Sequence, residues 1–165
     1  MAKESSFDVV STIDLQEVDN AYQQAKREIA TRYDLKDSGA SIDFSKSEKT
    51  LTVSAPADFV CRQVKDVLET KLLKRGIELN ALDWGNPQNA TGGTVRQVAK
   101  LIDGIDKETA GKINKDIKAL KLKCKVQIES DKLRVSSASR DTLQEVIQFL
   151  KGKDYGQPLQ FNNYR

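Results

Sequence analysis

The sequence predicts an α+β protein built from two units, each with the element order β-α-β-β-α-β. Two kinds of apolar pattern carry this prediction: alternation over short segments, as in strands, and recurrence every three or four residues over longer ones, as in amphipathic helices. These segments follow one another in the same order twice along the 165 residues. A stretch rich in glycine and asparagine separates the two copies.

The first copy is expected to occupy residues 1–84, beginning with a strand at residues 7–13. Asp14 followed by Glu17 predicts a helix start, because the Asp side chain can accept a hydrogen bond from an unpaired helix N–H. Regular apolar spacing extends that helix to residue 33. The later elements are a hairpin, a helix and a closing strand, expected at residues 42–44 with 51–55, at 58–75 and at 77–84.

A linker is predicted at residues 85–93, and the second copy at residues 94–165. Its elements are a strand, a capped helix, a hairpin, a second capped helix and a last strand, expected at 94–104, from Asp106, at 125–129 with 133–137, from Ser139 and at 158–164. The apolar positions of the two copies superpose, which predicts two ferredoxin-like units, each a four-stranded antiparallel sheet with two helices on one face. The terminal strands could be exchanged between the sheets without changing any local pattern.

The amino-acid composition limits the classes of function that the protein can have. An apolar content of 38% and a charged content of 31% are typical of a folded protein. The sequence contains no histidine, which excludes Ser-His-Asp and Cys-His catalysis and removes the commonest zinc ligand. We therefore expect a protein that is not an enzyme and holds no metal or cofactor.

Cys61 and Cys124 have no metal-site spacing and are expected to be reduced. No apolar run has the length of a membrane helix or signal peptide, so a cytoplasmic location is expected.

Charge is unevenly distributed between the two halves. Residues 1–84 contain 12 basic and 15 acidic side chains, whereas residues 85–165 contain 15 basic and 9 acidic ones. The densest basic tract contains seven lysines, Lys107, Lys112, Lys115, Lys118, Lys121, Lys123 and Lys125. This tract is either a solvated helix face or a nucleic-acid contact.

Candidate binding residues follow the predicted linker. Gly92 and Gly93 open a strand and not a helix, which favours a hinge or tight turn over a phosphate loop. On that strand Arg96 and Lys100 should share one face, where they could bind a phosphate, and Gln97 should lie on the other. An ordinary solvated strand is the alternative.

Two further segments carry candidate residues. In the closing run, Gln160, Asn162, Asn163 and Arg165 could read base edges beside an aromatic ring, or could be edge residues of an ordinary strand. Arg32 and Lys36 follow the first helix, where they form either a second anion site or a basic turn complementing the helix dipole.

Four segments together resemble the YajQ family of bacterial proteins, and the resemblance extends over the whole chain. The segments are Ser6–Ser11, Arg32–Lys36, Gly92–Gln97 and Pro158–Arg165. The resemblance implies two domains of RNA-recognition topology in a cytosolic protein that binds nucleotides or nucleic acid. Some members are described as cyclic di-GMP effectors that partner a transcription factor.

Two features depart from that pattern. Asp37 stands where we expect a glycine, and its carboxylate weakens Arg32 and Lys36 as an anion site. The expected central strands, at Lys49–Val53 and Lys132–Val135, lack the aromatic pair on which RNA-recognition domains stack bases. The expectation is therefore a binding protein for a guanine nucleotide, with cyclic di-GMP as one candidate, or for RNA. The alternative is a protein-interaction scaffold or transcription-factor partner with weak nucleotide binding.

Overall fold

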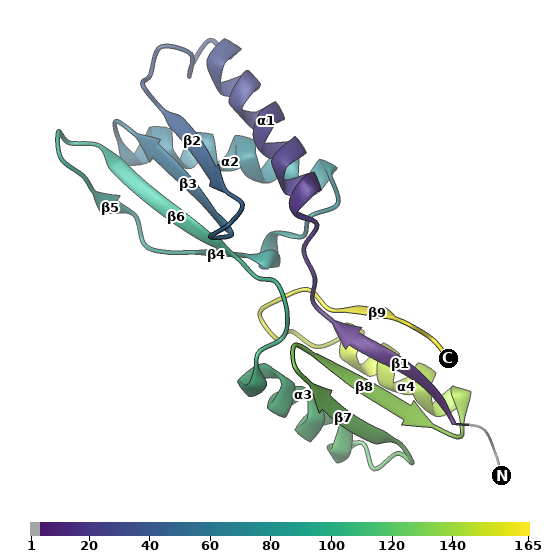
Figure 1. Ribbon diagram of the computed structural model, residues 1–165. Coiled ribbons are helices and arrows are strands. Elements are labelled where there is room, and N and C mark those ends of the chain that lie inside the picture. The colour runs from purple at the N-terminus through teal and green to yellow at the C-terminus, as the bar shows by residue number, and fades with distance from the viewer. Residues whose placement is uncertain (1–3) are drawn as a thin grey trace. The chain divides into compact units, whose positions relative to one another are not determined.

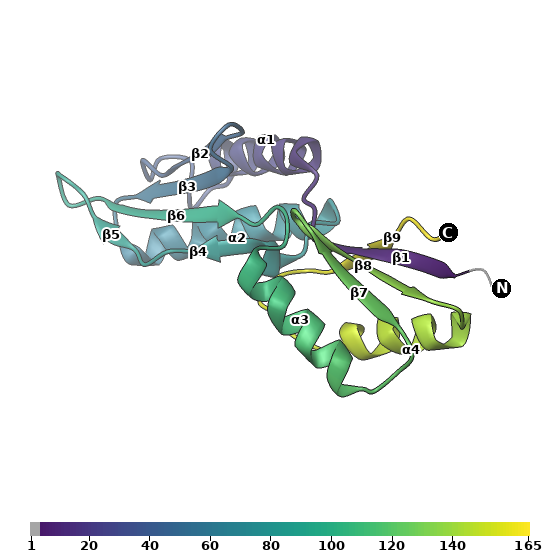
Figure 2. The same ribbon diagram turned by 60° about the horizontal axis from the view of Figure 1, so that its bottom comes forward.

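The computed structural model describes residues 4–165 and contains two antiparallel sheets, each with helices on one face (Figures 1 and 2). In chain order, the elements are β1 (Ser5–Val10), α1 (Leu15–Thr31), β2 (Ser41–Ser45), β3 (Thr50–Ala55), α2 (Asp58–Lys74), a short 3-10 turn (Leu79–Ala81), β4 (Leu82–Trp84), β5 (Gln88–Asn89), β6 (Val95–Leu101), α3 (Lys107–Ala119), β7 (Lys125–Glu129), β8 (Lys132–Ser137), α4 (Arg140–Lys151) and β9 (Gln160–Asn162). The predicted fold class is confirmed. None of the helices within residues 4–165 is long and apolar enough to span a bilayer.

The chain divides into two compact units whose boundaries differ from the predicted ones. The central unit is Ile13–Ile102, and the terminal unit joins the residues up to Thr12 with Asp103–Arg165. The strand order is β2-β3-β6-β4 in the central sheet, with β5 also paired to β6, and β7-β8-β1-β9 in the terminal sheet. The first strands of the two copies have therefore changed places, whereas the last strand, β9, stays with its own copy.

The division at residues 85–93 is accordingly corrected. All of residues 85–94 are exposed, as a linker would be, but they connect β4 to β6 within one sheet. The exchange puts β6 beside β3 in the central sheet, with Leu51 opposite Ala99. It likewise puts β1 beside β8 in the terminal sheet, with Phe7 opposite Val135. Both strands carry the same alternating apolar pattern, so local sequence does not determine which sheet each one joins.

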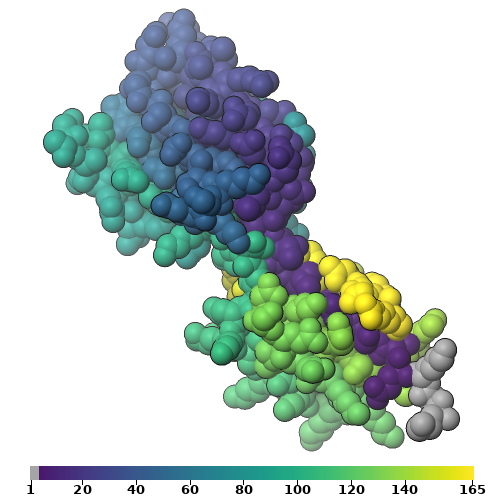
Figure 3. Space-filling model, in the orientation of Figure 1, coloured from purple at the N-terminus to yellow at the C-terminus, as the bar shows by residue number. Residues whose placement is uncertain are grey.

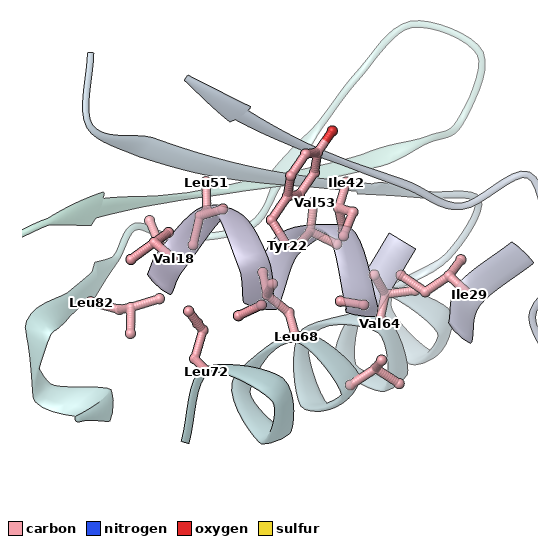
Figure 4. Packing of buried hydrophobic residues seen from close by; sticks show 14 of the residues in the cluster. Val18, Tyr22, Ile29, Ile42, Leu51, Val53, Val64, Leu68, Leu72 and Leu82 are labelled. Atoms are coloured by element: carbon pink, nitrogen blue, oxygen red, sulfur yellow. The ribbon is translucent and has the colours of Figure 1, made fainter. Parts of the chain in front are cut away.

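Each unit has its own hydrophobic core between its sheet and its helices. In the central unit, Val18, Tyr22 and Ile29 of α1 pack on α2 and on the inner face of the sheet (Figure 4). In the terminal unit, Phe7 and Leu133 of the sheet pack against α3 and α4. These inner positions alternate with polar residues on the helix-free face, which we call the open face of each sheet.

Three of the four α-helices in residues 4–165 begin at a capping side chain. Asp14 accepts from the backbone N–H groups of Gln16 and Glu17 at 3.0 and 3.2 Å, which confirms the predicted cap of α1. Asp106 and Ser139 cap α3 and α4 in the same way, also as predicted. Such caps stabilise a helix by about 1 kcal/mol each.

Candidate functional site

The predicted binding residues are divided between the two units. The central unit contains Arg32, Lys36, Arg96, Gln97 and Lys100, and the terminal unit contains Gln160, Asn162, Asn163 and Arg165.

Residues on β6 alternate as predicted. Arg96 and Lys100 are exposed on the open face, opposite Ser54 and Thr50 of β3 in the strand register. Gln97 points to the helix-covered face, where it is buried and donates from Nε2 to the Gly85 carbonyl at 2.8 Å. Arg96 and Lys100 thus present positive charge beside hydroxyl groups, while Gln97 has a structural hydrogen bond.

The two glycines before β6 lie in an exposed turn. Gly92 and Gly93 have φ values of +85° and +81°, a conformation that side-chain-bearing residues rarely adopt. This geometry explains why glycine occurs twice here, and it favours the turn interpretation over a phosphate loop.

The residues after α1 are already engaged with neighbours. Arg32 pairs through Nε with Asp34 at 2.8 Å and through Nη1 with Glu28 at 3.8 Å. The Lys36 ammonium lies 5.9 Å from the centre of the Tyr33 ring. With its charge already paired, Arg32 is a poor anion ligand.

Two amides of the closing run also have structural partners. The Gln160 side chain accepts from the backbone N–H of Thr12 at 2.8 Å and donates to its carbonyl at 3.3 Å. Asn163 donates from Nδ2 to the Asp8 carboxylate at 3.0 Å. Asn162 is exposed on the open face, opposite Asp8.

A pocket of about 340 Å³ lies within the terminal unit. Of the residues predicted to bind a ligand, Arg165 lines this pocket. We call it the Arg140 pocket. Its lining comes from the first residues of β1, the first residues of α4 and the segment after β9, namely Ser5, Ser6, Arg140, Leu143, Gln144, Tyr164 and Arg165. The chain end lies alongside β1 on the surface (yellow beside purple in Figure 3).

A β-bulge shapes this pocket. Asn162 pairs with Asp8, and Arg165 exchanges two backbone hydrogen bonds with Ser6, at 3.0 and 3.1 Å. Asn163 and Tyr164 therefore lie opposite the single residue Phe7, and Asn163 takes a left-handed φ of +57°. The extra residue shifts the side-chain alternation by one position.

The bulge brings Tyr164 to the helix-covered side of the sheet. Its ring lies 6.1 Å from the Phe7 ring, centre to centre, yet 58% of the residue is exposed. An aromatic face with one side on the protein and the other in solvent is suited to stacking a planar ligand.

The pocket is also positively charged. Arg140, the first residue of α4, is exposed, and the ion pairs of the described residues do not involve it. Arg165 donates from Nε to Asn163 at 3.3 Å, which leaves its terminal nitrogens available. Two guanidinium groups beside one aromatic ring can bind an anionic, planar molecule.

A basic surface follows α3 in the same unit. All seven lysines of the tract between Lys107 and Lys125 are exposed, and the ion pairs that they make are long: Lys112 to Glu108 at 3.9 Å and Lys125 to Glu4 at 3.7 Å. The terminal unit carries 14 basic and 11 acidic residues, whereas the central unit carries 13 of each. The terminal unit therefore carries the excess positive charge of the chain.

The fold and these surfaces define a two-unit α+β protein with sites suited to phosphate-bearing ligands. A family described as "Nucleotide-binding protein YajQ-like" matches residues 5–165. Bacterial relatives named as nucleotide-binding proteins are 50% identical in Bacillus cytotoxicus and 44% identical in Chloroherpeton thalassium, in each case over 165 residues and the full length of both chains. The chain belongs to the YajQ family of nucleotide-binding proteins. The family name describes a binding protein and not a class of enzyme.

Sequence reasoning did not find Arg140, Gln144 or Tyr164 as parts of a binding site. Arg140 and Gln144 look like exposed positions of an amphipathic helix, and strand alternation from the inward Phe161 would place Tyr164 on the opposite face. The doublet Asn162-Asn163 is the one available signal, because asparagine tolerates the left-handed conformation that a bulge requires.

Proposed function

We propose that this protein binds a guanine nucleotide in the Arg140 pocket and does not convert it chemically. The observation that carries the proposal is the gathering of Arg140, Arg165 and the exposed Tyr164 ring around one pocket of about 340 Å³. This volume is near the lower end of the range of about 300–1,000 Å³ for small-molecule sites. It suits one nucleotide unit, so cyclic di-GMP would place one of its two guanosines in the pocket.

Each lining group has a role in this proposal. The Tyr164 ring stacks on the base, and the Arg140 guanidinium binds phosphate oxygens at the start of α4. The free nitrogens of Arg165 can donate to O6 and N7 of guanine as a pair, a contact that adenine cannot accept because it carries an amino group at that edge. None of the side chains of the residues that line the pocket is a carboxylate, thiol or imidazole that could serve as a general base, which supports binding without conversion.

Calorimetric titration of GMP, AMP and cyclic di-GMP tests the proposal. Arg140→Ala is expected to weaken GMP binding by about ten- to one-hundred-fold, because a charge-assisted contact is lost. GMP should bind about ten-fold or more tightly than AMP if Arg165 reads the base. Tyr164→Ala should weaken both nucleotides, because stacking does not distinguish bases.

Arg96→Ala is the matched control, since Arg96 is an exposed arginine in the central unit. It should leave GMP affinity unchanged. If Arg96→Ala weakens GMP binding and Arg140→Ala does not, the nucleotide site lies on the open face of the central sheet with Lys100.

RNA binding is a second candidate function, favoured by the exposed lysines of α3 and the segment after it. Such binding needs only phosphate contacts and would weaken steeply as salt concentration rises. If the protein binds neither nucleotides nor RNA at low salt, the alternative of a protein-interaction scaffold, a transcription factor being one candidate partner, takes their place.

A further inference from the structure

Asp8 is a buried carboxylate on the open face of the terminal sheet, on the opposite side from the Arg140 pocket. It is 2% exposed, in the middle of β1. Three donors surround it: Arg134 Nε at 3.1 Å, Asn163 Nδ2 at 3.0 Å and Lys132 Nζ at 3.5 Å. A carboxylate placed there must be held by such contacts, since burial of an unpaired charge is strongly unfavourable.

The contact with Asn163 connects Asp8 to the bulge. Asn163 has a left-handed backbone, which asparagine adopts more readily than most residues but less readily than glycine, so contacts from its surroundings help to hold it. Its side-chain amide supplies that support by donating to a charged acceptor across the sheet. The residue that follows, Tyr164, is directed to the other face, where it lines the pocket.

We propose that Asp8 is a positioning residue for the nucleotide pocket. Its carboxylate holds Asn163 on the open face and thereby directs Tyr164, the next residue, into the pocket on the other side of the sheet. The inference rests on the proposed function of that pocket, and it adds that ligand affinity depends on a charge cluster that the ligand does not touch.

The neighbouring charges favour the ionised form of Asp8. Burial alone would raise the pKa of this carboxyl, but hydrogen bonds from Asn163 and Arg134 and the charge of Lys132 lower it below its usual value. Glu129 of β7 also faces this cluster and lies 3.8 Å from both Lys132 and Arg134, and Arg165 contacts Asn163 at 3.3 Å. Asp8 is therefore ionised at neutral pH, and a neutral substitute removes a charge that is present.

Two substitutions separate positioning from general stabilisation. Asp8→Asn removes the charge but keeps the size of the side chain. Asn163→Gly keeps the left-handed backbone available but removes the amide that contacts Asp8. Asp43→Asn is the matched control, because Asp43 is an exposed carboxylate on the open face of the central sheet.

The experiment combines fluorine NMR of ligand-free protein labelled with 3-fluorotyrosine and calorimetric titration with GMP. The chain has four tyrosines, so Tyr164→Phe identifies the Tyr164 resonance by its disappearance. We expect Asp8→Asn and Asn163→Gly to move this resonance while the other three stay in place. Each should also weaken GMP binding by about ten-fold, the effect of losing one charge-assisted contact. The double variant should bind as the weaker single variant does, because both changes break one connection. Asp43→Asn should change nothing.

A Tyr164 resonance that stays in place in both variants would overturn the inference, whether or not GMP binds. An effect of the double variant equal to the product of the two single effects would overturn it too, and so would a shifted resonance with unchanged GMP affinity. If the unmodified protein binds no GMP, the proposed function fails separately, and the Tyr164 resonance still decides whether Asp8 positions this ring.

Discussion

Replacing Asp8 with alanine is expected to destabilise the terminal unit by about 2–3 kcal/mol at pH 7. The substitution removes the two shorter hydrogen bonds to a charged acceptor, from Arg134 and Asn163, and a longer one from Lys132; the shorter bonds contribute about 1.5–3 kcal/mol each. The sum is reduced because Arg134 and Lys132 have side chains 34% and 32% exposed, so water can solvate them once they are released. The loss should therefore stay below that of breaking a fully buried pair.

Urea unfolding can measure this effect separately for the two units. The single tryptophan, Trp84, belongs to the central unit, so its fluorescence reports on that unit and serves as an internal control. Circular dichroism reports on both units. The alanine variant should lose stability in the dichroism transition and not in the fluorescence transition. An equal loss in both transitions, or none in either, would refute the reasoning.

The difference in stability between the wild-type protein and the Asp8→Ala variant should depend on pH. The pKa of Asp8 is lowered by folding from an ordinary value of 3.8, so the unfolded chain binds more protons than the folded one in this range. The stabilisation is therefore fully present above pH 3.8 and decreases as the pH falls through the lower folded-state value. Wild type and Asp8→Ala should converge in stability in acid. A difference between them that grows on acidification would mean that the carboxylate is not held as described.

Two further predictions concern other surfaces. Replacing Lys112, Lys115 and Lys118 with glutamate should weaken RNA binding at low salt in a filter-binding assay. The melting temperature should stay nearly unchanged, because exposed charges contribute little to stability. An unchanged RNA affinity would mean that these lysines form only a solvated helix face. Gly104→Ala should destabilise the terminal unit by about 1–2 kcal/mol in urea unfolding, because φ is +100° there and an added Cβ would lie 3.2 Å from Cβ of Asp131. An alanine variant as stable as wild type would contradict the strain expected from that conformation.

Much of the fold could be predicted because its signals are local. Helix starts at Asp14, Asp106 and Ser139 depend on a side chain and the next three residues, and the structure contains all three caps. The placement of Arg96 and Gln97 on opposite faces likewise follows from the strand period alone. Such features need no knowledge of which segments meet in space.

The features that could not be predicted are not local. Whether β1 or β6 joins a given sheet depends on partner strands far along the chain, and both strands have suitable apolar faces. The pocket depends on a bulge at Asn163 that is stabilised by Asp8, 155 residues away in sequence. Simple alternation would place Asn163 and Tyr164 on the wrong faces, so a site built on their true orientation is not visible in the pattern.

The strand exchange also determines the order in which the chain can fold during translation. The central unit is continuous in sequence and can complete its sheet as soon as β6 has been synthesised. The terminal unit is interrupted by the whole central unit, so β1 is synthesised before the central unit and its partners β8 and β9 are synthesised after it. Pairing across so long a separation closes a large loop and is intrinsically slow. A central unit that folds first would bring the two ends of that loop together, so we expect mutations that slow folding of the central unit to delay the terminal unit as well.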